Sequence, residues 1–216
     1  MKMITRMVVV AGMLATCHAS DVFHRVKIVK ISSEIQQTPQ FQIEGVRDKP
    51  VDPRFWLEIE AELEVETTAK SKFIPEITAH WHAVVFDHSG KKKETVRLLG
   101  ETSFKNIRTK GKKVLISAYI DPDTIEQLTG KRRLSENDIE GIALVIDGDN
   151  IIKKDKYAKG LSKATAKQAS RWWENEALWK EKRTIKQGIV AKSKTPFAQL
   201  WTDRYPSEKI VRVDRP

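Results

Sequence analysis

The chain has 216 residues and a formal net charge of +10, and this length suits one domain with a substantial hydrophobic core. Its single cysteine, Cys17, lies close to the N-terminus, so the rest of the sequence excludes a disulfide framework, a cysteine-based metal site and a catalytic thiol. Lys and Arg outnumber Asp and Glu by 39 to 29. This excess either favours contact with anionic partners or merely keeps the domain soluble.

Residues 1–19 have the three parts of a secretory signal peptide. Lys2 and Arg6 supply the positive start, residues 7–15 are a short apolar run, and Cys17 and Ala19 are small residues at the −3 and −1 positions of a cleavage site. The apolar run is too short to span a bilayer. We therefore expect cleavage after Ala19 and export of the mature chain to the periplasm, the outer membrane or the cell surface.

An alternative for the leader is lipidation. Residues 14–17, Leu-Ala-Thr-Cys, are close to a lipoprotein box, in which Cys17 becomes the lipidated first residue. Thr16 is bulkier than the Gly, Ala or Ser usual at its position, so cleavage after Ala19 is the preferred prediction.

Residues 55–67 predict a long β-strand with one buried and one wet face. Apolar and acidic side chains alternate along this stretch with a period of two, which no helix reproduces. The apolar set is Phe55, Leu57, Ile59, Ala61, Leu63 and Val65, and the acidic set is Glu58, Glu60, Glu62, Glu64 and Glu66. Five carboxylates on one face repel one another unless neighbouring strands place basic residues opposite them. We expect Arg25 and Lys27, on a strand over residues 22–35, to be such partners, and interpret the carboxylates as a structural ladder rather than a catalytic pair.

The middle of the chain predicts further strands and one short helix. Asp121 and Pro122 predict the N-cap and the first position of the helix, and Gly130 ends it. Around seven strands with few helices indicate a mainly β fold, an immunoglobulin-like β-sandwich with a short inter-strand helix. The further strands are expected, between turn signals, over residues 76–87, 94–107, 114–120, 139–147 and 184–190.

The composition changes after Asp149, and the C-terminal third is expected to embellish the sandwich. Lys, Ala and Glu dominate residues 153–183, which predict a partly helical insertion with an amphipathic helix that ends near Trp179. Its positions at helical spacing are Ala166, Ala169, Trp173 and Ala177. Residues 191–216 are expected to form an extended segment, and residues 20–216 to form a single domain.

His80, His82 and His88 are the only cluster that resembles a metal site. On a strand, His80 and His82 share one face and could hold a zinc ion together with His88. Against this, Val84 occupies the same face and His88 falls in a turn. We favour the alternative in which Trp81 packs inward and the histidines face solvent or a partner strand, giving at most a pH-sensitive surface. No catalytic, cofactor-binding or metal residue is assigned.

Six tryptophans are many for a chain of this length. Trp172 and Trp173, set among basic residues, could form a sugar-stacking platform or a partner-binding hot spot. The simpler interpretation is that one or more of the rings anchor the C-terminal third onto the sandwich. Burial of Trp172, Trp173 and Trp201 separates the two interpretations, because buried rings exclude a sugar platform.

Residues 194–205, KTPFAQLWTDRY, are distinctive in a way that composition does not explain. Together with the leader, the Pro-Arg-Phe-Trp-Leu-Glu stretch at 53–58, Leu-Thr-Gly at 128–130 and Trp-Trp-Glu at 172–174, this segment resembles a family of verrucomicrobial pilus-associated exported proteins. The resemblance implies an immunoglobulin-like fold similar to that of archaeal type IV pilus-like subunits, a place at the cell envelope or in a surface appendage, and no enzymatic activity. The leader lacks the cleavage context of type IV pilins, and no long hydrophobic helix opens the mature chain.

We therefore expect an exported, non-catalytic structural or binding protein without a cofactor, a component of a pilus or of the cell envelope that binds protein partners and is compatible with a homo-oligomer. Its working parts would be exposed strand edges, which can accept a partner strand, and the basic C-terminal third. The alternative is an adhesive, carbohydrate-binding module that contacts acidic glycans or a membrane surface through Trp, Lys and Arg. A periplasmic metal-dependent enzyme using His80 and His82 is less favoured, and no nucleic acid partner is expected because exported proteins seldom meet nucleic acid.

Overall fold

The computed structural model describes residues 22–40, 52–90, 92–109, 111, 113–151, 161–162 and 171–209. The expected signal peptide lies outside these residues, as does most of the partly helical insertion expected over residues 153–183, including Ala166 and Ala169. Among the described residues, no helix has the length and apolar character needed to cross a membrane.

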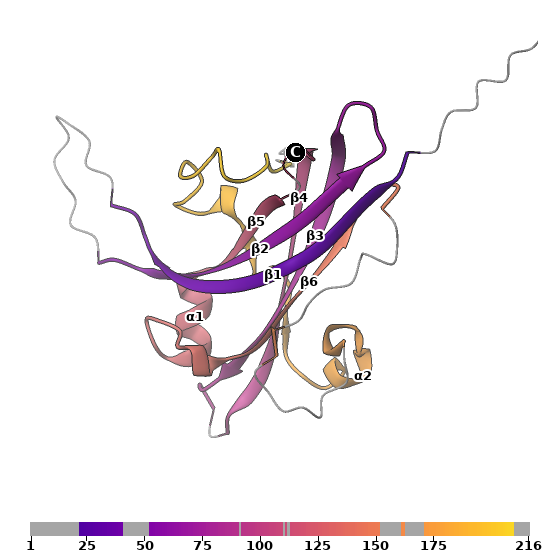
Figure 1. The fold of residues 1–216 in the computed structure, drawn as a ribbon. Coiled ribbons are helices and arrows are strands. Elements are labelled where there is room, and N and C mark those ends of the chain that lie inside the picture. The colour runs from indigo at the N-terminus through magenta and orange to yellow at the C-terminus, as the bar shows by residue number, and fades with distance from the viewer. Residues whose placement is uncertain are drawn as a thin grey trace, which may run out of the picture.

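Two β-sheets face one another and form a sandwich (Figure 1). The first sheet has the strand order β1-β2-β5-β9, and the second has the order β7-β6-β3-β4-β8. The strands of the first sheet are β1 His24–Gln37, β2 Phe55–Thr67, β5 Lys113–Ile120 and β9 Val190–Ala191. Those of the second are β3 Phe73–Asp87, β4 Glu94–Arg108, β6 Ile139–Asp147, β7 Leu161–Ser162 and β8 Thr184–Ile185. The predicted mainly β sandwich is confirmed, and the arrangement is consistent with an immunoglobulin-like fold.

The hydrophobic core lies between the sheets, where the inward positions of the long strands meet. On β2, alternate residues from Leu57 to Val65 are buried, as the period-two pattern predicts. Trp81 on β3 is fully buried in the same core, which confirms that this ring packs inward. The two sheets therefore bury the apolar face that the alternation marks on each strand.

Helix α1, Pro122–Thr129, has the predicted ends. Asp121 is the N-cap, and its Oδ1 accepts a hydrogen bond from the backbone N–H of Thr124 at 2.9 Å. Gly130 ends the helix with φ 65°, a left-handed conformation that glycine adopts without steric cost. The local sequence therefore sets both ends of this helix.

The prediction of one strand over residues 184–190 is wrong, because two short strands lie there instead. Thr184–Ile185 (β8) pairs with β4 in the second sheet, whereas Val190–Ala191 (β9) pairs with β5 in the first. Gln187 lies between them with φ 61°, a left-handed conformation that breaks an extended chain. The segment thus crosses from one sheet to the other.

In the described part of the stretch expected to be partly helical, the helical structure ends at Trp179 as predicted, but it does not form one continuous amphipathic helix. Residues 171–183 contain a 3₁₀ turn, Trp172–Glu174, and a one-turn helix α2, Glu176–Trp179. Asn175 separates them with ψ 88°, which is not helical, and its side chain caps α2. The large rings, rather than a continuous amphipathic face, fix this segment. Two other 3₁₀ turns are Glu136–Asp138 and Lys192–Lys194.

Candidate binding surface

The carboxylates on the outer face of β2 each face a basic or polar partner. Arg25 contacts Glu66 at 3.8 Å and Lys27 contacts Glu64 at 3.3 Å, as predicted. Lys113 of β5 contacts Glu62 at 2.7 Å. Cross-strand pairs of opposite charge stabilise a sheet, whereas a row of like charges destabilises it. The geometry therefore supports a structural ladder.

The end of the ladder at Glu58 and Glu60 is covered by the C-terminal segment, residues 190–209. Arg204 donates to both Glu60 oxygens at 2.8–2.9 Å, and the Tyr205 hydroxyl donates to Glu60 at 2.7 Å. Glu58 is only 7% exposed, so the expectation of a wet face is wrong at this position. The reason is that residues distant in the sequence fold over it.

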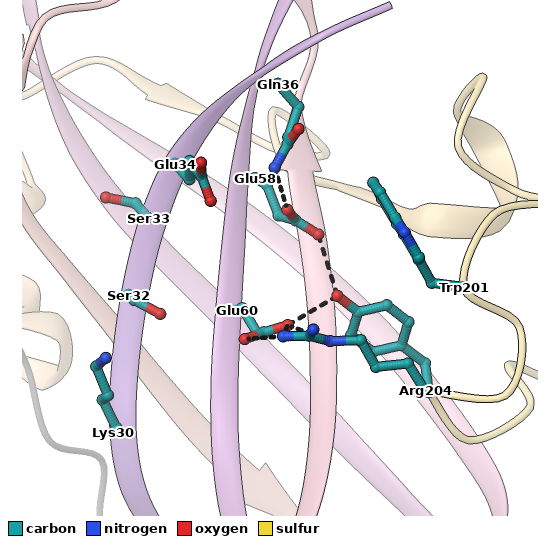
Figure 2. Close-up of a pocket in the computed structure, with 10 residues that line it drawn as sticks. Lys30, Ser32, Ser33, Glu34, Gln36, Glu58, Glu60, Trp201 and Arg204 are labelled. Carbon is teal, nitrogen blue, oxygen red and sulfur yellow. Dashed lines mark hydrogen bonds and ion pairs between the residues drawn. The ribbon is translucent and has the colours of Figure 1, made fainter. Parts of the chain in front are cut away.

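Glu58 accepts hydrogen bonds from three side chains. The Tyr119 hydroxyl donates to it at 2.5 Å and the Tyr205 hydroxyl at 3.3 Å. Gln36 Nε2 donates to it at 3.1 Å (Figure 2). Burial, reinforced by the hydrogen bonds to these carboxylates, raises the pKa values of Tyr119 and Tyr205 above the ordinary value. Both hydroxyls therefore stay protonated and act as donors that fix Glu58 and Glu60 in place.

A set of stacked rings anchors the C-terminal segment to the first sheet. Phe197 is buried and stacks on Tyr119, with ring centroids 5.1 Å apart and an interplanar angle of 11°. Trp56 contacts the same ring edge-on at 6.1 Å, and Trp201 stacks on it at 6.3 Å. Burial of a phenyl ring contributes about 1.5–3 kcal/mol. The distinctive segment at residues 194–205 is thus the cover of this outer face.

Lys192 lies beneath the same cover. Its Nζ donates to the carbonyl oxygen of Ala198 at 3.2 Å and lies 5.6 Å from the centre of the Tyr205 ring. Burial lowers the pKa of Lys192, although the nearby Glu58 and Glu208 act in the opposite direction. This lysine holds the covering segment together rather than facing a ligand.

A hollow of about 450 Å³ opens between β1 and the covering segment (Figure 2). Trp201, 45% exposed, stands on one side of it. The opposite side is formed by the outward residues of β1. The lining residues are Lys30, Ser32, Ser33, Glu34, Gln36, Glu58, Glu60, Trp201, Arg204 and Tyr205. We call the hollow and the adjoining edge of β1 the binding surface.

The three histidines have separate partners. His80 Nδ1 lies 3.3 Å from Glu101, His82 Nδ1 accepts a hydrogen bond from Arg97 at 3.1 Å, and His88 Nε2 lies 3.2 Å from Asp138. Across the part of the chain that the structure describes, no group of three or more His, Cys, Asp or Glu side chains could hold a metal ion.

Two titratable groups outside the binding surface are strongly perturbed. Burial lowers the pKa of His82 to about 4, and the neighbouring Arg97 and His80 act in the same direction. Burial opposes ionisation of Asp138, but hydrogen bonds from Ser135 and the ammonium of Lys131 outweigh it and lower its pKa to about 2. Both groups are therefore sensitive to acid.

Trp172 and Trp173 do not form a sugar platform, because they are only 5% and 7% exposed. With Trp179 they pack on Val84 and Ala143, on the outer face of the second sheet. Trp179 Nε1 donates to the carbonyl oxygen of Trp172 at 2.8 Å. These rings anchor the C-terminal third, as the simpler interpretation predicted, and only Trp201 of the three discriminating rings is exposed.

The alternation in the sequence marks the carboxylates of this surface but not the residues that cover them. Arg204 and Tyr205 lie within the distinctive segment at 194–205, yet no local pattern pairs that segment with β2. Tyr119 lies opposite Glu58 in the β2–β5 register. Its position in the strand predicted over residues 114–120 is the one sequence signal that could place its hydroxyl on the outer face.

The fold is a two-sheet β-sandwich whose C-terminal segment covers one outer face and forms one side of the hollow there. One protein-family model matches residues 18–212, and because this match spans most of the chain, the chain belongs to that family. A crystal structure of a protein from Akkermansia muciniphila, a verrucomicrobe, is similar over 88% of this chain and 95% of that chain, with a TM-score of 0.70 and 20% sequence identity. At this identity the likeness shows the fold alone. No curated protein matches the chain.

Proposed function

We propose that the chain is an exported, non-catalytic component of the cell envelope, such as a pilus-associated protein, and that it works by binding other protein chains. The observation that carries this proposal is the edge of β1. This 14-residue strand has β2 as its one neighbour in the sheet order of the described residues. The backbone groups on its other side are a template for an additional strand.

The state of the carboxylates supports binding rather than catalysis. Glu58 and Glu60 are held by hydroxyl, amide and guanidinium donors. A general acid and base need carboxyl groups that can exchange protons with a substrate. Here their role is to fix the covering segment beside β1.

A photo-crosslinking side chain at Ser32, on β1, tests the proposal in the native cell envelope. We expect adducts at this position with a protein chain of the envelope, either a different protein or a second copy of this chain. The same group at Lys105, an exposed residue of β4 on the other sheet, is the matched control and is expected to give none. Absence of adducts at Ser32, or equal adducts at both positions, contradicts the proposal.

A second candidate function is glycan binding at Trp201, favoured by the exposure of this ring beside the hollow. Arg204 is already paired with Glu60, so Lys30 is the cation of the hollow that has no partner among the described residues, and the hollow suits a neutral sugar better than an acidic glycan. Binding of a glycan array that is lost in Trp201→Ala and kept in Trp172→Phe would support this candidate. Equal binding by both variants would exclude it.

A further inference from the structure

The edge of β1 is regular over its second half. After a register shift between Ile28 and Lys30, residues 30–37 pair with β2 without interruption. The outer side of this stretch has no strand beside it among the described residues, and the one bridge that β1 makes elsewhere joins His24 to Ile151 at its start. A partner strand therefore has a straight edge of several residues to pair with.

Two charged side chains on this edge have no partner of their own. Lys30 and Glu34 are both exposed on the face that carries the carboxylate ladder, and neither makes an ion pair or a side-chain hydrogen bond with any described residue. Glu34 also lies directly across from Glu58 in the sheet register. Like charges directly opposite one another are unfavourable, so a cation beside Glu34 would stabilise the sheet.

We propose that two copies of the chain pair β1 with β1, antiparallel, about a twofold axis at Ser32. Positions equidistant from Ser32 then face one another, so Lys30 of each copy lies opposite Glu34 of the other. Two cross-strand ion pairs then form from four charges that have no other partner among the described residues. The inference rests on the proposed function and deepens it, because it names a second copy of this chain as the occupant of the edge.

Two features of the β1 edge also disfavour pairing with unrelated strands. A bulge and edge lysines are the means by which proteins prevent indiscriminate strand addition. Lys27 and Lys30 lie on this edge, and the register shift interrupts it at Val29. In a twofold interface the same surface of each copy contacts the other copy. In this register a partner strand must place an acidic residue opposite Lys30, as a second copy of this chain does with Glu34.

Hollows lie beside β1 on both faces of the first sheet. The outer one holds Trp201 and Arg204, as described above. The second, of about 530 Å³, lies beside Ile35 and is partly apolar, with Leu57, Leu134 and Ile139 in its lining. Strand addition uses such flanking hollows for alternate side chains of the added strand. Side chains of a strand added beside β1 would therefore lie near a hollow on each face of the sheet.

Sedimentation equilibrium of residues 20–216 tests the pairing through charge reversal. We expect a monomer–dimer equilibrium that weakens with salt. Lys30→Glu and Glu34→Lys each place two like-charged pairs in the dimer and should weaken it about tenfold or more. An equimolar mixture of the two variants should recover dimers, because positions 30 and 34 again carry opposite charges across the interface. Lys105→Glu, the same charge change on β4, should have no effect.

A single cysteine at the axis gives an independent measurement. Cys17 belongs to the leader, so residues 20–216 contain no other cysteine. Ser32→Cys should cross-link to itself on oxidation, because directly opposed Cβ atoms lie roughly 4.5–5.5 Å apart, close to disulfide reach. Gln36→Cys, four residues from the axis on the same face, should not cross-link, because the antiparallel register places its two copies far apart.

The outcomes separate the inference from the proposed function. A chain that stays monomeric at high concentration, a dimer unaffected by Lys30→Glu, or a variant mixture that fails to recover dimers overturns the pairing of β1 with β1. If Ser32 nevertheless cross-links to a different envelope protein, the proposed function stands without the inference. A charge-dependent dimer of a chain that fractionates outside the cell envelope supports the inference and contradicts the proposed function.

Discussion

Replacing Tyr119 by Phe removes one hydroxyl from the most enclosed hydrogen bond of the binding surface. That hydroxyl donates to Glu58 Oε1 at 2.5 Å, and both side chains are buried. The ring itself is retained, so its stack on Phe197 is unchanged in shape. The substitution therefore tests the hydrogen bond rather than the packing.

The expected loss of stability depends on the hydrogen-bond donors that Glu58 keeps in the Tyr119→Phe variant. Hydrogen bonds to charged groups contribute about 1.5–3 kcal/mol. Glu58 keeps Gln36 at 3.1 Å and Tyr205 at 3.3 Å, but both bonds are longer and Tyr205 is shared with Glu60. We expect the free energy of unfolding to fall by about 2 kcal/mol at pH 7.

Urea denaturation of residues 20–216 measures this change as a lower midpoint with an unchanged slope. In a Glu58→Gln background the hydroxyl faces a neutral amide, and the same substitution should cost about 1 kcal/mol or less. A loss below about 0.5 kcal/mol in the native background, or an equal loss in both backgrounds, would refute the role assigned to this carboxylate.

Four further outcomes are expected. Leu57→Asp should abolish folding, as measured by circular dichroism, because it buries an unpaired charge. Glu60→Gln weakens a partly exposed ion pair with Arg204 and should lower the free energy of unfolding in urea by less than about 1 kcal/mol. The folded-state pKa of His82, about 4, lies below its unfolded value of 6.5, so stability should fall by roughly 2–3 kcal/mol as the pH drops from 6.5 to 4; His82→Gln should flatten that dependence in urea titrations at pH 7 and 4.5. The folded-state pKa of Asp138, about 2, lies below its ordinary value of 3.8, so the stability it confers is complete above pH 4 and lost as the pH falls toward 2; Asp138→Asn should remove about 2 kcal/mol of that acid dependence in thermal melts. An unchanged pH profile in either variant contradicts the corresponding assignment.

Much of the sandwich could be predicted because its strands carry their own pattern. The bounds of β2 and β6 agree with the predicted ones, and the caps of α1 lie at Asp121 and Gly130. Alternation and capping are local properties, so a short window of sequence contains the whole signal. The prediction failed at residues 184–190, where a left-handed Gln187 turns a run of strand-forming residues into a crossing between sheets.

The sequence by itself determined which face of each long strand is apolar, because side-chain direction alternates with every residue regardless of what packs above it. Only the tertiary structure decided which outward carboxylates are enclosed. Glu58 and Glu66 belong to the same alternating set, yet Glu58 is buried and Glu66 is exposed. The difference comes from Tyr205, which lies 147 positions from Glu58 in the chain and 3.3 Å from it in space. Such a contact depends on how the C-terminal segment crosses between sheets, and no periodicity within a strand encodes that path.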